Sequence, residues 1–282
     1  MKDMKLVPTL DWEAEKKSVG VRTDGSYKVA PKYRAIIRND SNEVLSIVKK
    51  NYNLLSNAEF MQLVNEIRVI TNFDLQGFQA VKGGGVVLGY LKNSEPDLKI
   101  GGLAFEDYLV FGNSFTRETS LFVGSSSIVI SCMNAFGRIH QGIKIPHFST
   151  MDEKIKELKR YFVNYFEAKK DLYNAMEGFT KIKIDAEIIE QAINYVFELE
   201  KFEKPDKEIS KQRFAKVVDC RESILQEVER IGDNGWGLFN GMTHFTSHKL
   251  ASSKTKEETI GNLYGMKNYF NQRAFQFISE LV

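Results

Sequence analysis

Two histidines, His244 and His248, have the spacing that places both imidazole rings on one face of a helix. Zinc sites use such pairs together with a further protein ligand, and a metalloprotease also has a glutamate directly after the first histidine. Here no glutamate follows His244, and no third ligand lies nearby in the sequence. Most histidine pairs of this kind cap or hydrogen-bond their surroundings. We therefore predict no bound metal and keep His244 and His248 only as a secondary hypothesis.

A glycine-rich run, Lys82-Gly83-Gly84-Gly85, has the residue types of a phosphate-binding loop. Such a loop must be followed by the N-terminus of a helix, because the helix N–H groups converge on the phosphate. The next residues, Val86-Val87-Leu88, are typical of a strand. The pattern thus favours a β-hairpin turn. An intermediate hypothesis is that the glycines let the tip of this hairpin approach a nucleic-acid backbone.

Cys132 and His147 have the residue types of a nucleophile and its base, as do Cys132 and His140. Cys132, however, ends the apolar run that begins at Ile128, where a buried and inert thiol is expected. The acidic pair Glu106-Asp107 lies beside an expected turn and favours a solvated loop tip over a two-metal site. We therefore expect no cofactor and favour a protein that is not an enzyme.

Basic and aromatic residues alternate around the expected strands, and this pattern is typical of proteins that bind single-stranded nucleic acid. The alternative is an ordinary solvated sheet face with half-buried tyrosines, which composition alone favours. The residues that would contact nucleic acid are Tyr33, Arg34, Arg38, Lys49, Lys50, Tyr52, Lys82, Arg117 and Arg138.

The composition excludes several classes of protein. The 282 residues are 43% hydrophobic and 27% charged, as in a soluble globular protein, and the formal net charge of +2 does not require a nucleic-acid partner. No apolar run approaches the ~20 residues of a membrane span, and the N-terminus lacks the apolar core of a secretory signal. Cys132 and Cys220 are too few for a disulfide framework. We expect a cytoplasmic protein with no membrane partner.

Elements able to position these residues begin as strands and end as helices. Alternation and turn residues predict a hairpin from 33–38 and 44–48, and Ser56 with Glu59 forms a capping box that starts a helix. Further strands are predicted at 75–81, 86–91, 108–115 and 127–132. Apolar residues at helical spacing then predict a helix from Thr150 to a stop at Gly178, others through 188–197 and 214–231, and a last helix from Thr255.

The predicted fold class is therefore α+β, with a mostly antiparallel sheet and one early helix, followed by a helical C-terminal layer. We expect an N-terminal arm at 1–30, a sheet region at 31–148 and a helical region at 149–282 that packs on the sheet, together forming one continuous unit. We expect this arm to be ordered only if another part of the protein packs on Trp12.

Several polar residues at the ends of these elements match a known family. They are Tyr52 with Asn57, Asn113 with Ser114, Cys132 with Asn134, His147, and the block of Trp236, Asn240, Thr243 and His248. On these residues the chain from Tyr33 onward resembles the phage and plasmid proteins of the domain of unknown function 932. Ala135 and Phe148 replace the threonines that usually follow Asn134 and His147, which argues against a shared catalytic role. Asn113, Asn134, His147 and Asn240 fit a structural role, tying strand ends to helices.

The resemblance implies a protein of a mobile element, and the order of hairpin, helix and strands is also similar to phage single-strand annealing recombinases. These would imply a homo-oligomer that binds single-stranded DNA in recombination or replication. The alternative hypothesis is an accessory factor that binds a protein, for example an inhibitor of a host defence component. Its interface would be the aromatic residues of the last helix, Tyr264, Tyr269, Phe270, Phe275 and Phe277.

Overall fold

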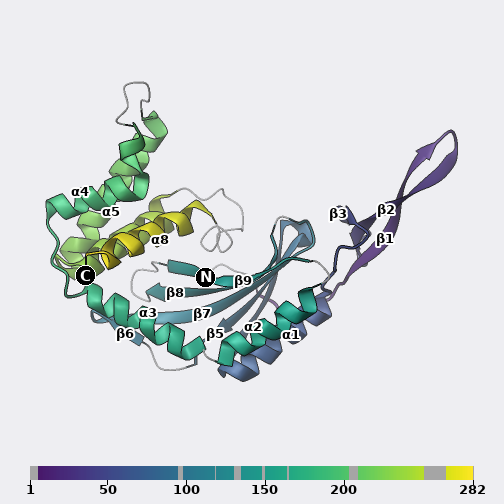
Figure 1. Ribbon diagram of the computed structural model, residues 1–282, viewed down its shortest axis with the longest axis horizontal. Helices are drawn as coiled ribbons and strands as arrows, with labels where there is room; N and C mark the ends of the chain where they lie inside the picture. The colour runs from purple at the N-terminus through teal and green to yellow at the C-terminus, as the bar shows by residue number, and fades with distance from the viewer. Residues whose placement is uncertain are drawn as a thin grey trace. The chain divides into compact units, whose positions relative to one another are not determined.

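The computed structural model describes residues 6–94, 98–117, 119–129, 135–147, 150–163, 165–202, 209–250 and 265–281 (Figure 1). Chain contacts divide it into two units. The first unit comprises Met1–Ser94, Tyr108–Ser125 and Ile139–Tyr165, and the second comprises Glu95–Asp107, Ser126–Arg138 and Phe166–Val282. The chain thus passes between the units several times, so their boundaries do not follow the sequence blocks 1–30, 31–148 and 149–282.

The strands form two antiparallel sheets. One has three strands in the order β1 (Ala14–Thr23), β2 (Ser26–Arg38) and β3 (Val44–Lys49). The other follows the order β4 (Asp74–Val81), β5 (Val86–Lys92), β7 (Leu103–Ser114), β8 (Leu121–Val129) and β9 (Ala135–Ile145), with β6 (Leu98–Ile100) paired to β7. A short 3₁₀ turn, η1 (Lys82–Gly84), joins β4 to β5.

The early helix α1 (Asn57–Thr71) begins where the sequence predicts it. Ser56 and Glu59 form the capping box, and the Glu13 carboxylate accepts hydrogen bonds from the N–H groups of Asn57 and Ala58 at 2.7 and 2.8 Å. Together these groups pair donors that a helix start leaves open. The buried face of α1 carries Phe60, Leu63, Val64 and Ile67, which share one core with side chains of β4, β5 and β7.

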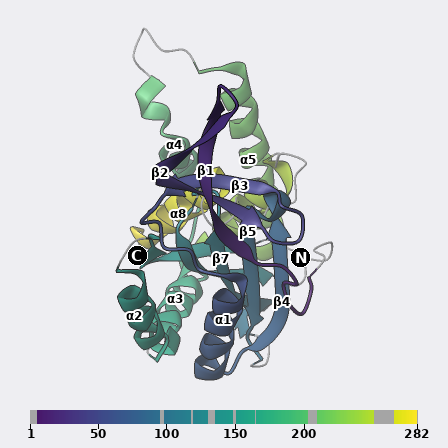
Figure 2. The ribbon, with the colours of Figure 1, turned by 90° about the vertical axis from the view of Figure 1, so that its right-hand side faces the viewer.

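A second helix of the first unit, α2 (Met151–Val163), lies beside α1 (Figure 2). Leu158 and Phe162 complete the same core, and the Phe162 ring lies 6.3 Å from that of Phe111 on β7. An ion pair between Lys159 and Glu66 bridges the exposed sides of the two helices. In each helix the apolar stripe faces the core and the charged stripe faces solvent.

The second unit is mainly helical and has a separate core. It contains α3 (Tyr165–Phe179), α4 (Ala186–Phe197), the 3₁₀ turn η2 (Leu199–Phe202), α5 (Lys211–Ile231), α6 (Gly235–His244), the π-helical turn η3 (Phe245–Lys249) and α8 (Met266–Ser279). Trp236 is buried between Phe105 and Phe239, with ring centroids 5.6 and 5.9 Å away. Cys220 is fully buried, and burial raises the pKa of its thiol, as expected for an inert cysteine.

The predicted α+β class, with antiparallel sheets and a helical C-terminal region, is confirmed. Some elements differ from the prediction. The helix predicted from Thr150 to Gly178 is described as α2 up to Val163 and as α3 from Tyr165, with residue 164 outside the described residues, and α3 ends one residue later than predicted, at Phe179. The predicted start of the last helix at Thr255 lies outside the described residues, and α8 is described from Met266.

The acidic pair in the sheet region was wrongly expected at a loop tip. Asp107 lies within β7 and is buried. Ser127 Oγ donates a hydrogen bond to its carboxylate at 2.6 Å, and the Tyr173 hydroxyl donates another. A buried carboxylate needs such donors to offset its lost hydration.

No helix in the described part of the chain is both long and apolar enough to span a membrane.

Candidate nucleic-acid interface

Strands β1 and β2 form a long β-hairpin that includes most of the predicted N-terminal arm; we call β1, β2 and β3 together the arm from here on (Figure 1). Asp24 and Gly25 both have positive φ and join the paired residues Thr23 and Ser26, which is the geometry of a two-residue hairpin turn. The Tyr27 ring lies over Gly20, where a Cβ would be only 2.8 Å from the ring and 2.3 Å from the Lys28 carbonyl oxygen. Any side chain at residue 20 would therefore push the two strands apart.

Positive charge is concentrated in this hairpin and β3. Residues 14–50 contain nine Lys or Arg and four Asp or Glu, whereas the whole chain contains 39 and 37. The rest of the chain is consequently acidic on balance. An anionic partner would be attracted to these 37 residues rather than to the chain as a whole.

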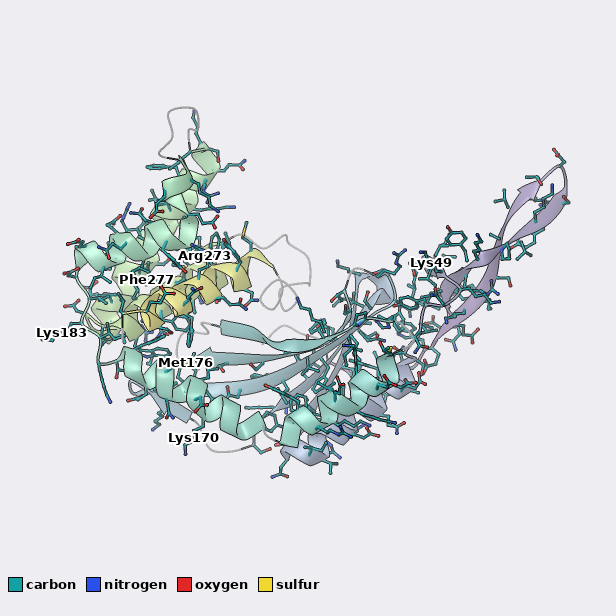
Figure 3. The ribbon with its side chains drawn as sticks, viewed as in Figure 1. Lys49, Lys170, Met176, Lys183, Arg273 and Phe277 are labelled. Atoms are coloured by element: carbon teal, nitrogen blue, oxygen red, sulfur yellow. The ribbon has the colours of Figure 1, made fainter. Side chains whose placement is uncertain are left out.

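The strand register places basic and aromatic side chains side by side near the base of the arm. Tyr33 on β2 lies opposite Lys49 on β3, and the next residue on this face of β2, Ala35, lies between Lys17 on β1 and Ile47 on β3. Tyr33 and Ile47 are 46% and 53% exposed, and both lysines are exposed (Figure 3 labels Lys49). We call Lys17, Tyr33, Ile47 and Lys49 the outer face of the arm.

Arg34 and Lys16 lie on the opposite, inner face of the same sheet, beside the buried Ile36 and Val48. The Arg34 guanidinium donates to the Tyr33 carbonyl oxygen at 2.7 Å, and Lys16 Nζ donates to that of Tyr52. Burial, and then the charge of Arg34, lower the pKa of Lys16. The predicted cations are thus divided between two faces, and Arg34 does not share a face with Tyr33.

Arg38 holds three parts of the first unit together. Its guanidinium donates two hydrogen bonds to the Asp40 carboxylate at 3.0 and 2.6 Å and one to the Gly83 carbonyl oxygen at 3.0 Å. It also lies over the Trp12 ring, 4.3 Å from the centroid, and Trp12 in turn contacts Phe115 edge-on. The hydrogen bonds from Arg38 lower the pKa of Asp40, and the packing of Arg38 and Phe115 on Trp12 buries its ring.

The glycine run forms the turn between β4 and β5, so its interpretation as a hairpin is confirmed. Lys82, Gly83 and Gly84 all have positive φ, and a Cβ on Gly84 would lie 2.9 Å from the Arg38 guanidinium. The turn meets the loop after β7, where Gly85 O accepts from Phe115 N at 2.8 Å. Lys82 and Arg117, both exposed, are therefore carried by adjacent loops.

Tyr52 is buried, so its ring offers no exposed surface on which a base could stack. Its hydroxyl donates to the Ser114 carbonyl oxygen at 2.8 Å, and its ring stacks on His147 with centroids 4.8 Å apart. Burial raises the pKa of this hydroxyl, and the charge of Arg117 lowers it by less. Tyr52 is thus a packing residue in this structure.

The polar residues that carry the family resemblance in the first unit hold the segment between β3 and α1. His147 Nδ1 donates to Asn53 O at 3.0 Å, Asn113 Nδ2 donates to Leu55 O at 3.0 Å, and Asn57 Nδ2 donates to Trp12 O at 2.6 Å. The tautomer of His147 follows because a carbonyl oxygen can only accept. Asn113 and His147 therefore hold the loop that leads from β3 into α1.

Burial lowers the pKa of the His147 ring below its ordinary value of 6.5, although the hydrogen bond to Asn53 opposes the shift. The unfolded chain then binds more protons than the folded one below about pH 6.5, so the first unit should lose stability as the pH falls from that value toward the folded pKa. We expect a slope of up to ~1.4 kcal/mol per pH unit.

Unfolding monitored by Trp12 fluorescence in a Trp236→Phe background, between pH 7.5 and 5.5, measures this slope. His147→Gln should flatten it, because the amide can still donate to Asn53 O but does not titrate. An equal slope in the two proteins would mean that another group causes the pH dependence.

The two histidines of the zinc hypothesis lie in the second unit, at the end of α6 and in η3. Their ring centroids are 4.8 Å apart, and burial followed by the neighbouring His248 lowers the pKa of His244. Among the described residues, no three His, Cys, Asp or Glu side chains are grouped to hold a metal ion. Asn240, on the same helix, donates to Trp236 O at 2.9 Å, one turn before it.

The remaining predicted residues are placed as follows. Lys50 is exposed just after β3, and Arg138 lies on β9. Cys132 and Asn134 lie outside the described residues. Sequence reasoning missed Lys17, Arg22, Tyr27 and Lys28, because residues 1–30 were interpreted as a polar arm and no strands were predicted there. The Asp24-Gly25 pair, a strong hairpin signal, was the feature that would have revealed them.

The alternative protein-binding interface on α8 is largely core. Phe270 is buried, and Phe275 and Phe277 pack against the core of the second unit. Tyr269 is 42% exposed and lies near the Arg273 guanidinium. Tyr264 lies outside the described residues. The described aromatic residues of α8 thus mainly fill the interior of the second unit.

Comparison with known proteins adds a family and no named relative. No curated protein and no solved structure matches the chain. The family model described as Domain of unknown function (DUF932) matches residues 44–264, from the first residue of β3 to just before α8. Tyr33, Arg34 and Arg38 precede this match, whereas Asn113, His147, Trp236 and Asn240 fall within it. Because the match covers more than half of the chain, the protein belongs to the family of domain of unknown function 932.

Proposed function

We propose that this protein binds single-stranded DNA on the outer face of its arm, without a cofactor. In this proposal the protein is encoded by a phage or plasmid and acts in the cytoplasm, in recombination or replication, with several copies along one strand. The observation that carries the proposal is the register of β1, β2 and β3. It sets an exposed tyrosine, Tyr33, directly beside Lys49 and one row from Lys17.

This combination suits a flexible strand of nucleic acid. An exposed aromatic ring offers a stacking surface to any base, and lysines beside it neutralise the phosphates on either side of that base. The outer face also contains exposed Ile47, which adds apolar contact. Because a lysine holds phosphate as a point charge and a tyrosine stacks on every base, binding should depend little on sequence.

Measurement of affinity for a labelled oligonucleotide over a series of salt concentrations tests the proposal. Affinity should fall steeply as salt rises, because lysines that contact phosphates release bound counterions. An affinity that stays flat from low to high salt, or no binding at low salt, would remove the proposal. The mass of the protein–oligonucleotide complex reports whether several copies assemble.

Tyr33→Ser should weaken binding by about tenfold or more, since base stacking on one aromatic ring contributes ~1–3 kcal/mol. Tyr269→Ser provides a matched control, because Tyr269 is similarly exposed but lies on α8 in the second unit. Equal loss in both variants would show that Tyr33 makes no specific contribution. Thermal unfolding of each variant, with a Tm close to that of the unsubstituted protein, verifies that the fold is intact.

A further inference from the structure

The outer half of the arm differs from its base in being a ribbon of only two strands. Pairing of β2 with β3 covers Tyr33–Ile37, while pairing of β2 with β1 continues out to the turn at Asp24 and Gly25. We call residues 20–29 the arm tip. Val21 and Arg22, which are neighbours on β1 and so point to opposite faces, are both exposed. The tip is therefore open to solvent on both faces (Figure 1).

This exposure includes large apolar side chains. Val21, Tyr27 and Val29 are 64%, 57% and 51% exposed. A two-stranded ribbon is marginally stable alone, and these side chains contribute little to it when they face water. The Asp-Gly turn and the contact of Tyr27 with Gly20 set the shape of the tip instead. These exposed apolar groups are available for contact with a partner.

The register also distributes charge to both faces of the tip. Arg22 lies opposite Tyr27 on one face, and Val21 lies opposite Lys28 on the other. One face thus carries Arg22 with Tyr27 and Val29, the other carries Lys28 with Val21, and the single carboxylate of the tip, Asp24, is in the turn. A partner must therefore present negative charge on two sides of the ribbon at once, with apolar or hydrogen-bonding groups between them.

The dimensions of a two-stranded ribbon match one such partner. The major groove of B-form DNA is about 12 Å wide and admits a two-stranded ribbon between its two phosphate walls, whereas the minor groove is only about 6 Å wide. Inside the major groove, an arginine can bond the acceptor edge of guanine, and a valine can contact the thymine methyl group.

We propose that the arm tip enters the major groove of duplex DNA, with Arg22 and Lys28 facing the opposite sides of the groove. This inference deepens the proposed function, on which it rests: the outer face at the base of the arm holds a single strand, and the tip holds a duplex. A protein that pairs strands converts the first ligand into the second, so adjacent sites for both would retain the product.

A shortened arm separates the two sites experimentally. Gly20 and Val29 are already paired, so replacing residues 21–28 by Asn-Gly closes the ribbon with a two-residue turn. Affinity for a 30-base-pair duplex should fall at least tenfold, while affinity for a 30-nucleotide single strand should change less than threefold. The double variant Arg22→Ser and Lys28→Ser, which keeps the ribbon, should weaken duplex binding in the same direction.

Methylation of the bound duplex by dimethyl sulfate identifies the groove, because guanine N7 lies in the major groove and adenine N3 in the minor groove. Protection of guanine N7 supports the inference, and protection of adenine N3 alone overturns it. Equal loss of single-strand and duplex binding on shortening would also overturn it. If the native protein binds single strands but no duplex, the inference fails while the proposed function stands. If it binds duplex but no single strand, the proposed function fails while binding of duplex by the arm tip stands.

Discussion

Replacement of Gly241 by alanine is expected to destabilise the second unit by about 3 kcal/mol. This value is at the upper end of the usual cost of an added methyl group, because the new Cβ would press against backbone atoms. Gly241 lies on α6 where that helix crosses α5. A Cβ at this position would be 2.3 Å from Ile224 Cα and 3.0 Å from the Ile224 backbone nitrogen. Backbone atoms cannot turn aside as a side-chain end can. The two helices would have to separate and break the packing of buried Cys220 and Met242.

Gly178→Ala is the matched control, because Gly178 is also helical but a Cβ there meets no atom within 4 Å. It should leave stability unchanged or raise it by up to ~1 kcal/mol, since alanine favours the helix over glycine. Trp236 is buried in the second unit and reports its unfolding by fluorescence in a Trp12→Phe background. A loss below 1 kcal/mol in Gly241→Ala would mean that α5 and α6 are not packed at this distance.

The sequence was most informative where local chemistry alone decides the structure. The capping box at Ser56 starts α1, Gly232 follows the last residue of α5, and the glycine run at 82–85 is a turn. Each of these depends on residues a few positions apart. The spacing was less informative over 150–178, where apolar residues recur from Leu158 and Phe162, in the first core, to Leu172 and Met176, in the second. Spacing cannot show that these two pairs belong to different cores.

Long-range geometry explains what was missed at the candidate site. Arg34 and Tyr33 are neighbours in sequence, but a strand sends successive side chains to opposite faces. Tyr52 carries the residue type of a stacking platform, yet contacts with Ser114 and His147, far away along the chain, bury it. The register of three strands, rather than the run of basic residues, determines which cations lie together. The pairing of Lys17 with Ala35 is what places Lys17 on the outer face of the arm.

Arg38 and Lys49 should respond in opposite ways to replacement by alanine, although the sequence placed both among the phosphate contacts. Arg38→Ala should destabilise the first unit by about 2 kcal/mol, through loss of the cation–π contact with Trp12 and of the partner of Gly83 O. The pair with Asp40 is exposed and adds little. Because the Arg38 donors are used within the protein, the dependence of DNA affinity on salt should be unchanged.

Lys49→Ala should have the reverse pattern, with unchanged stability and a salt slope for single-stranded DNA that is smaller by about 0.7, the share of one phosphate contact. Trp12 fluorescence reports the stability of the first unit, and oligonucleotide titrations between 50 and 200 mM salt, roughly the range over which such contacts weaken, report the slope. A reduced slope in Arg38→Ala at full stability would show that its guanidinium leaves Asp40 and Gly83 to bind phosphate. Unchanged slopes in both variants would instead place the phosphate track away from the outer face of the arm, because Lys49 is the cation directly opposite Tyr33 there.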